Sequence, residues 1–311
     1  MSIAINALAP ILFLIAIGCL LKKTNFFEAA LWPALEKLSY YVLMPILLIH
    51  VLSSKQIDHM PWQEIALAVN IPVLSVAALF WLSKSFFPSV SAESFTSIFQ
   101  GGVRFNTFVG LSLAQGLFGA EGVVIGAVGS GFMIVLINLL CITTFSLSLK
   151  TQGGILKTLG LQIIKNPLIM GCLIGLTLNM LHIPVPTALA TSFDVLSRAS
   201  LPIALITVGA ALQFSSLLKN RSVSALVGIV QFVLKPFLAG VCCYAFGLNG
   251  VTAATLILFL ATPTAPSSYI LSRQLGGDHE MMATLITQQT LFAFLSIPLT
   301  IWVVGQVIPL P

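Results

Sequence analysis

Charged residues are scarce in this sequence. Asp, Glu, Lys and Arg make up 7% of its 311 residues, whereas 58% are hydrophobic. Soluble domains average about 25% charged residues, because their surfaces must be solvated by water. The composition therefore excludes a soluble enzyme, a disordered chain and a nucleic-acid-binding domain, in spite of the net charge of +5. An all-α polytopic protein that lies in the lipid bilayer is expected.

Uncharged apolar runs separated by short loops predict ten transmembrane helices. One crossing of a bilayer takes about 20 residues, so ten crossings leave no room for a soluble domain. The predicted helices span residues 6–21, 36–54, 63–83, 95–117, 121–149, 159–182, 187–213, 222–246, 250–273 and 281–307.

The basic residues of the loops fall on one side of the predicted membrane. Alternate loops hold Lys22, Lys23, Lys84, Lys150, Lys157, Lys219, Arg221 and Arg273, and the opposite loops hold Lys55. Cytoplasmic loops carry an excess of Lys and Arg. We therefore expect both termini on the non-cytoplasmic side of the membrane.

The two halves of the chain, 1–152 and 153–311, match at an offset of about 157 residues. Pro10 corresponds to Pro167 and Gly18 to Gly175, in the similar segments AP-ILFLIAIG and NP-LIMGCLIG. Five helices per half is an odd number, so the second half enters the membrane inverted relative to the first. Inverted repeats are typical of secondary transporters, whose substrate sites lie near the bilayer midplane.

The fourth and ninth predicted helices contain residues that interrupt helices, at corresponding positions of the two repeats. Two interrupted helices at matching positions indicate a transporter site, because freed backbone groups must face protein or a wet cavity. The expected break residues are Gly101, Gly102 and Gly110 in the fourth helix, and Pro263 and Pro266 in the ninth.

Polar residues near these breaks are the candidate substrate-binding groups. Arg104 lies near mid-bilayer depth, where an ionisable side chain marks a functional site by default. Beside the N-terminal ends of half-helices it favours an anion. The predicted substrate-binding residues are Arg104, Asn106, Thr107, Asn138, Thr262, Thr264, Ser267 and Gln288. For Asn138, Gln288, Gln289 and Thr290, contacts between helices are an equal alternative.

Three further charges lie within predicted spans. Asp194 and Arg198 are four residues apart, so we expect them to neutralise each other on one helix face. Lys235 has no partner nearby in the sequence; it either lines a vestibule or binds freed carbonyl groups. No metal-binding spacing of His or Cys is present, and no catalytic or cofactor motif.

The chain resembles bacterial members of the auxin efflux carrier family over nearly its whole length. The similar segments are LEKLSYYVLMPILLI, RFNTFVGLSL, KNPLIMGCLIG, LPIALITVGAAL, LKPFL and ATPTAPSSYILSRQLGGD. One departure is Ser112, which lies where family members usually have a proline in the fourth helix.

The resemblance implies ten helices in two inverted repeats, like sodium/proton antiporters and bile-acid symporters, with the fourth and ninth helices crossing. Helices 1, 2, 6 and 7 would form a scaffold that commonly dimerises, and helices 3–5 and 8–10 a moving transport domain. The implied substrates are small organic anions such as malate, malonate or auxin-like acids. The implied location is the bacterial cytoplasmic membrane, with Na⁺ or H⁺ as the candidate coupling ions.

Other functions fit the sequence less well. A cation/proton antiporter needs carboxylates at the midplane, but the fifth predicted helix has Asn138 and no acid. A non-transporting membrane sensor stays open as an alternative. An intramembrane enzyme lacks a visible catalytic constellation, so we expect a transporter and not an enzyme.

Overall fold

The computed structural model describes residues 2–54, 60–86, 90–149, 165–217 and 219–308. These residues are mostly helical, and no β-strand occurs among them. Seven of the described helical segments are long and apolar enough to cross a membrane. The prediction of an all-α multi-pass membrane protein is therefore confirmed.

The first three spans follow the predicted pattern. Helix α1 covers Ser2–Lys23. Helix α2 (Leu31–Leu38), the π-helical turn η1 (Ser39–Leu43) and α3 (Met44–Ser54) form one continuous span. The wide turn η1 precedes Pro45, whose ring would clash with the carbonyl one α-helical turn earlier. Helix α4 (Trp62–Ser83) continues into the short 3₁₀ helix η2 (Lys84–Phe86).

The fourth predicted helix is interrupted. Helix α5 (Ala92–Val103) ends at an extended Arg104, and α6 (Thr107–Leu149) begins after Asn106. Within α6 the backbone turns at Gly119, where φ is 60° and ψ is −145°. The apolar segment 92–149 has 58 residues, far more than one crossing needs. This segment holds both the fourth and the fifth predicted helices.

The second half contains the remaining helices. They are α8 (Pro167–Met180), α9 (Thr187–Ala210), η3 (Phe214–Ser216), α10 (Arg221–Ile229), η4 (Val230–Leu234), α11 (Lys235–Ala245), α12 (Gly250–Leu260), α13 (Ser267–Leu275) and α14 (His279–Val307). Helices α10, η4 and α11 form one span, with the π-helical turn η4 just before Pro236. The ninth predicted helix is interrupted between α12 and α13. Residues 159–164 of the sixth predicted helix lie outside the described part of the chain.

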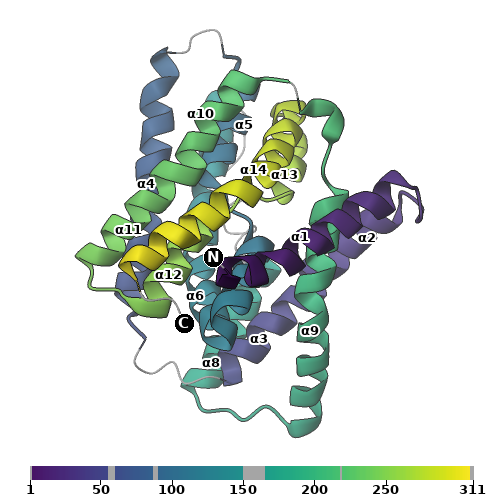
Figure 1. The fold of residues 1–311 in the computed structure, drawn as a ribbon, viewed down its shortest axis with the longest axis vertical. Coiled ribbons are helices and arrows are strands. Elements are labelled where there is room, and N and C mark those ends of the chain that lie inside the picture. Colours follow the sequence, from purple (N-terminus) through teal and green to yellow (C-terminus); the bar gives the residue numbers. More distant parts are fainter. Residues whose placement is uncertain (1, 55–59, 87–89, 150–164, 218, 309–311) are drawn as a thin grey trace.

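The helices form two groups that lie beside each other (Figure 1). In one group α1 packs on α9, and α3 packs on both α8 and α9. In the other, α6 packs on α4, α5 and α12, while α11 packs on α4 and α12. Figure 1 shows α1, α2, α3 and α9 on one side of the molecule and α4, α11, α12 and α14 on the other.

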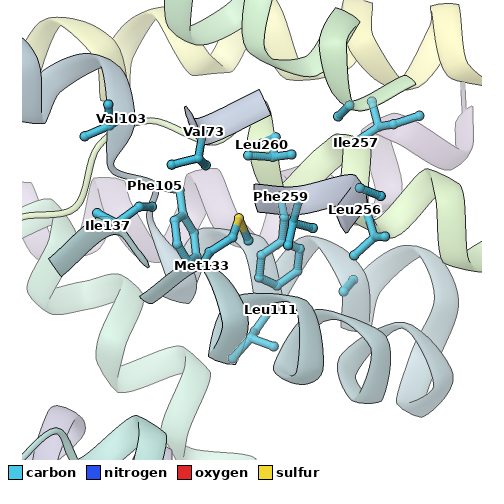
Figure 2. Packing of buried hydrophobic residues seen from close by; sticks show 14 of the residues in the cluster. Val73, Val103, Phe105, Leu111, Met133, Ile137, Leu256, Ile257, Phe259 and Leu260 are labelled. Atoms are coloured by element: carbon cyan, nitrogen blue, oxygen red, sulfur yellow. The ribbon is translucent and has the colours of Figure 1, made fainter. Parts of the chain in front are cut away.

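The largest apolar cluster surrounds Phe259 of α12 (Figure 2). Its ring lies so close to α6 that a Cβ atom at Gly110 would be 2.8 Å from the ring, and one at Gly126 would be 2.5 Å from it. Leu111, Met133 and Leu256 complete this contact. The cluster therefore holds α12 against both parts of α6, on either side of Gly119.

Candidate functional site

The two helix breaks, 104–106 and 261–266, contact each other. The backbone nitrogen of Asn106 donates a hydrogen bond of 3.2 Å to the Thr262 hydroxyl. The Gln231 amide, from η4, donates to the carbonyl oxygen of Arg104 at 3.2 Å and also to that of Thr262. Segments more than 150 residues apart in the sequence are thus joined at one point.

Asn106 begins helix α6. Its side-chain oxygen Oδ1 accepts hydrogen bonds from the backbone nitrogens of Phe108 and Val109, at 3.0 and 3.2 Å. Such N-cap residues satisfy amides that have no partner within the helix. The other side-chain atom, Nδ2, is buried and has no hydrogen-bond partner. The NH₂ group of Asn106 therefore has no acceptor within the described part of the protein.

Lys235 holds the C-terminal end of α5. Its side chain is completely buried, and its Nζ atom donates to the carbonyl oxygens of Gly102 and Arg104 at 3.2 and 3.0 Å. It also donates to Oε1 of Gln231 at 2.6 Å. A cation is favourable at a helix C-terminus, where carbonyl groups point outward. Of the two roles considered for Lys235, these contacts match the binding of freed carbonyls.

Gln289 of α14 also links the two breaks. Its Nε2 atom donates to the carbonyl oxygen of Gly101 at 2.8 Å, and its Oε1 atom accepts from the backbone nitrogen of Thr264 at 2.9 Å. Thr264 is completely buried, and its hydroxyl lies 3.3 Å from that of Ser268. Freed backbone groups of both breaks are thus paired with buried amide side chains.

A cavity of about 590 Å³ lies where the breaks meet the other group of helices. From the breaks, α6 and α13 it is lined by Arg104, Phe105, Asn106, Thr107, Phe108, Ile134, Ile137, Asn138, Ala265, Pro266, Ser267, Ile270, Leu271 and Gln274. The opposite wall is formed by Pro33, Glu36, Lys37, Tyr40, Tyr41, Lys165, Asn166, Pro167, Leu168, Thr207 and Val208. The cavity therefore lies between the two groups of helices, which also contact each other through α6.

Three helix N-termini reach this cavity. They are those of α6 at Thr107, α13 at Ser267 and α8 at Pro167. The N-terminus of α8 is capped by Asn166, whose Oδ1 atom accepts from the backbone nitrogens of Leu168 and Ile169. Helix N-termini carry partial positive charge. Among the lining residues that the structure describes, the charged side chains are three cations and one carboxylate, Lys37, Arg104, Lys165 and Glu36.

Seven of the eight predicted substrate-binding residues lie in the cavity wall or directly beside it. Five of them line the cavity, namely Arg104, Asn106, Thr107, Asn138 and Ser267. Thr262 and Thr264 are completely buried beside it and hold the breaks together.

Gln288, which was also predicted to bind the substrate, is not among the residues that line this cavity. Its amide donates to the carbonyl oxygens of Leu217 and Lys219, in the segment before α10. Consecutive residues of a helix point about 100° apart, so Gln289 faces the breaks and Gln288 does not.

The predicted break residues also need one correction. Gly101 and Gly102 lie within α5 and Gly110 lies within α6, so the interruption itself is at residues 104–106. The glycines instead permit close packing: a Cβ atom at Gly102 would lie 2.1 Å from the Phe80 ring. In the ninth helix, Pro263 lies inside the interruption and Pro266 directly precedes α13.

The remaining intramembrane charges lie away from the cavity. Arg198 Nη2 is 2.8 Å from Asp194 Oδ2, which is the expected pairing four residues apart. His50 Nε2 of α3 lies 3.7 Å from the other carboxylate oxygen. Ser112, which lies in the region where the resemblance implies a proline, is buried in α6 and its hydroxyl has no hydrogen-bond partner.

Three further residues of the breaks and the cavity lack a local sequence signal, namely Gln231, Glu36 and Lys165. Gln231 was overlooked because its partners, Arg104 and Thr262, lie 127 and 31 residues away. Glu36 and Lys165 lie within the similar segments LEKLSYYVLMPILLI and KNPLIMGCLIG and carry no motif of their own. Each is a charged residue within an apolar predicted span, and this is the signal that could have found them.

Comparisons with known proteins find similarity to membrane transport proteins. A family model described as membrane transport protein matches residues 150–301. An uncharacterized transporter of Methanothermobacter thermautotrophicus is 25% identical over 195 residues, which are 62% of either chain.

Two rice proteins (Oryza sativa subsp. japonica) are also similar. The probable auxin efflux carrier component 5a is 24% identical over 43% of this chain and 38% of its own length. Component 3b is 27% identical over 47% of this chain and 25% of its own. Each alignment thus covers less than two thirds of the relative. Together, these matches confirm the resemblance to the auxin efflux carrier family that the sequence motifs predict.

Proposed function

We propose that this protein is a secondary transporter that moves a small organic anion across the cytoplasmic membrane by alternating access. The main observation behind the proposal is which ends of the broken helices face the cavity. The carbonyl groups freed at their C-terminal ends are bound by the protein's own Lys235, Gln231 and Gln289. The N-termini of α6 and α13 face the cavity.

This arrangement favours an anion over a cation. Partial positive charge remains on the cavity side, while the carbonyl oxygens of Gly101, Gly102, Arg104 and Thr262 already accept hydrogen bonds from side chains. The lining cations Arg104, Lys165 and Lys37 outnumber the single carboxylate, Glu36. A cation/proton antiporter would need the opposite arrangement.

Arg104 and Asn106 are proposed to bind the carboxylate of the substrate. Guanidinium groups match the planar geometry of carboxylates. The free Nδ2 donor of Asn106 lies two residues away in the same break. Thr107, Asn138 and Ser267 line the same space with polar groups that can orient the rest of the molecule. Malate, malonate and auxin-like acids are suitable candidates, since each has a carboxylate on a small body.

The ten-helix inverted repeat is part of this proposal, and equivalent contacts in both halves support it. Gly18 of α1 lies against Ile206 of α9, and Gly175 of α8 lies against Ile49 of α3, at the same offset of about 157 residues. Gly119 and Gly276, also at this offset, both have positive φ angles, of 60° and 79°. The repeat boundary is proposed between residues 152 and 153.

A moving domain follows from the position of the cavity between the two groups of helices. Helices α1, α2–α3, α8 and α9 are proposed as the scaffold, which also forms a homodimer. Helices α4–α6 and α10–α14 are proposed as the transport domain. The loop charges favour termini outside the cytoplasm; of these, Lys55, Lys150 and Lys157 lie outside the described residues. In that orientation the cavity opens to the cytoplasm, near Lys37, Lys165 and Gln274.

Counterflow in proteoliposomes tests the proposal. Purified protein would be assayed with labelled malate, malonate, succinate, citrate and indole-acetate. We expect saturable exchange of at least one anion, and a loss of about 100-fold in Arg104→Gln, because a hydrogen-bonded charge of this kind contributes about 3 kcal/mol.

The matched control is Arg273→Gln, which removes an exposed arginine from the last turn of α13. It is expected to exchange at the wild-type rate. Unchanged exchange by a folded Arg104→Gln protein would disprove the assigned site. Failure of the folded wild type to exchange any of the anions would disprove the transport function.

A further inference from the structure

Lys235 lies at the C-terminal end of a broken helix without a carboxylate partner. The carbonyl oxygens of Gly102 and Arg104, where α5 ends, accept hydrogen bonds from its Nζ atom at 3.2 and 3.0 Å. The third oxygen at Nζ is Oε1 of Gln231, at 2.6 Å. The lysine is completely buried, and none of the ion pairs found in the described part of the chain includes it. A buried lysine that meets three uncharged oxygens is unusual and requires an explanation.

The number of oxygens around Nζ matches the charged form of the side chain. An ammonium group has three N–H donors, one for each oxygen. A neutral amine has only two, and its lone pair would face the third oxygen. The Gln231 amide cannot turn to donate in its place, because its Nε2 atom already donates to the carbonyl oxygens of Arg104 and Thr262. The contact between the two breaks thus contains one fixed positive charge.

The same oxygens are of the kind that bind a metal cation. In transporters with broken helices, unwound backbone carbonyls and the C-terminal ends of half-helices coordinate Na⁺. A helix C-terminus also carries partial negative charge, which suits a cation. The break holds the Arg104 guanidinium as well, but Na⁺ in place of the ammonium group would leave the total charge of the break unchanged. The lysine therefore stands where these oxygens could hold an ion of the same charge.

We propose that the contact between the two breaks is a site for a monovalent cation, and that the ammonium group of Lys235 is its permanent occupant. The lysine supplies the positive charge that a bound Na⁺ would otherwise supply. A bound ion can leave the site, whereas an ammonium group on a side chain cannot. Removal of this side chain alone should therefore open a site for Na⁺, formed by Gly102, Arg104 and Gln231. The site depends only on contacts within the protein, so it can be tested without transport.

The direct test is thermal unfolding of the purified full-length proteins in sodium chloride and in choline chloride at equal concentrations. Lys235→Ala leaves the three oxygens without their donor and frees the volume of the side chain for an ion and water. Its midpoint should be low in choline and should rise by about 3 °C once Na⁺ exceeds its dissociation constant about tenfold. The wild-type midpoint should be the same in both salts, because the ammonium group already fills the site.

Two control variants separate ion binding from a general effect of salt. Lys235→Met removes the charge but keeps an unbranched side chain that fills the same space, so it should be destabilised equally in both salts. Lys84→Ala removes a lysine whose Nζ atom contacts the Ser148 hydroxyl and the rings of Trp81 and Phe95. This change leaves no group of carbonyl oxygens unpaired, so its midpoint should also be the same in both salts.

The outcomes decide between a cation site and a merely structural lysine. A Na⁺-specific rise of the midpoint that is confined to Lys235→Ala supports the cation site. Equal midpoints of Lys235→Ala in the two salts would overturn it. Failure of this variant to fold in either salt would overturn it too, because Na⁺ should replace the missing charge. The same conclusion would follow from a Na⁺-specific rise in the wild type or in Lys235→Met.

Anion exchange in proteoliposomes adds a test that rests on the proposed transport function. Wild-type exchange should be unchanged when Na⁺ is replaced by choline, whereas exchange by Lys235→Ala should fall about tenfold without Na⁺. Wild-type exchange that requires Na⁺ would overturn the proposal, since the lysine would then not replace the ion. Absence of exchange in the wild type would instead disprove the transport function, and the unfolding measurements would still decide on the cation site.

Discussion

The two groups of helices are held together by different means. Helices α1, α3, α8 and α9 meet through glycines: a Cβ atom at Gly18 would lie 2.0 Å from the Ile206 carbonyl oxygen, and one at Gly209 would lie 2.0 Å from that of Ile15. The broken helices are instead joined by buried polar side chains, Lys235, Gln231 and Gln289.

This difference reflects what each group must do with its backbone. Unbroken helices satisfy their own hydrogen bonds, so close packing of small residues is enough to join them in a membrane. Broken helices leave backbone groups without partners, and these must be satisfied inside the protein. The first arrangement is sensitive to added side-chain volume, and the second is sensitive to the loss of specific hydrogen-bond donors and acceptors. Substitutions that add volume at a glycine or remove a polar side chain therefore test the two arrangements separately.

The largest effect on stability is expected at the glycine crossing of α1 and α9. Gly209→Val would force two backbones apart, and overpacking of this kind costs about 3 kcal/mol. Gly228→Ala is the control, because a Cβ atom there meets nothing within 4 Å. It should be neutral or stabilise the protein by about 0.5 kcal/mol. Thermal unfolding of the purified proteins measures both, and equal midpoints would contradict the described crossing.

A smaller loss is expected when the polar contacts of the breaks are removed. Gln289→Leu leaves the Gly101 carbonyl and the Thr264 amide unpaired, at a cost of about 2 kcal/mol. Its neighbour provides the control: Gln288→Leu affects only contacts to the segment before α10 and should cost less than about 1 kcal/mol. Unfolding midpoints and anion exchange would be compared. An equal loss in both variants would mean that Gln289 has no special role.

The smallest effect on stability is expected from a change that keeps the helix cap and replaces the unpartnered amide nitrogen with an oxygen. Asn106→Asp retains the oxygen that accepts from Phe108 and Val109, and a negative charge suits a helix N-terminus. Stability should change little, because the helix N-terminus offsets the cost of the buried charge. Anion exchange should fall at least about tenfold, since one charge-assisted hydrogen bond is lost and the added carboxylate repels the anion. Wild-type exchange rates in this variant would remove Asn106 from the binding site.

Much of the fold could be predicted because the bilayer imposes strong rules on sequence. Apolar length identified the spans, and the prolines of the ninth helix marked its interruption. The fourth helix was harder. Its glycines suggested a break, but they lie within helices, and the interruption is at Arg104–Asn106. Glycine occurs both at helix breaks and at close helix contacts, and sequence alone does not distinguish these two roles.

The site could be predicted only where residues act near their own break. Arg104 and Asn106 line the cavity as expected, since the break that frees the backbone also positions them. Gln231 and Lys235 act on a break that lies more than 120 residues earlier in the chain. Which face of a helix meets a distant segment depends on tertiary packing. The sequence around a polar residue inside a span therefore does not identify its contact partner.

The buried ammonium group of Lys235 makes the two halves of the chain depend on each other. Without the second half, the carbonyl groups of Gly102 and Arg104 would lack their donor in a medium that supplies none. Without the first half, Lys235 would keep only Gln231 as an acceptor in the middle of a span, where a charge is costly. If the proposed repeat arose by duplication, these lysine contacts distinguish the present halves from a unit that folded alone.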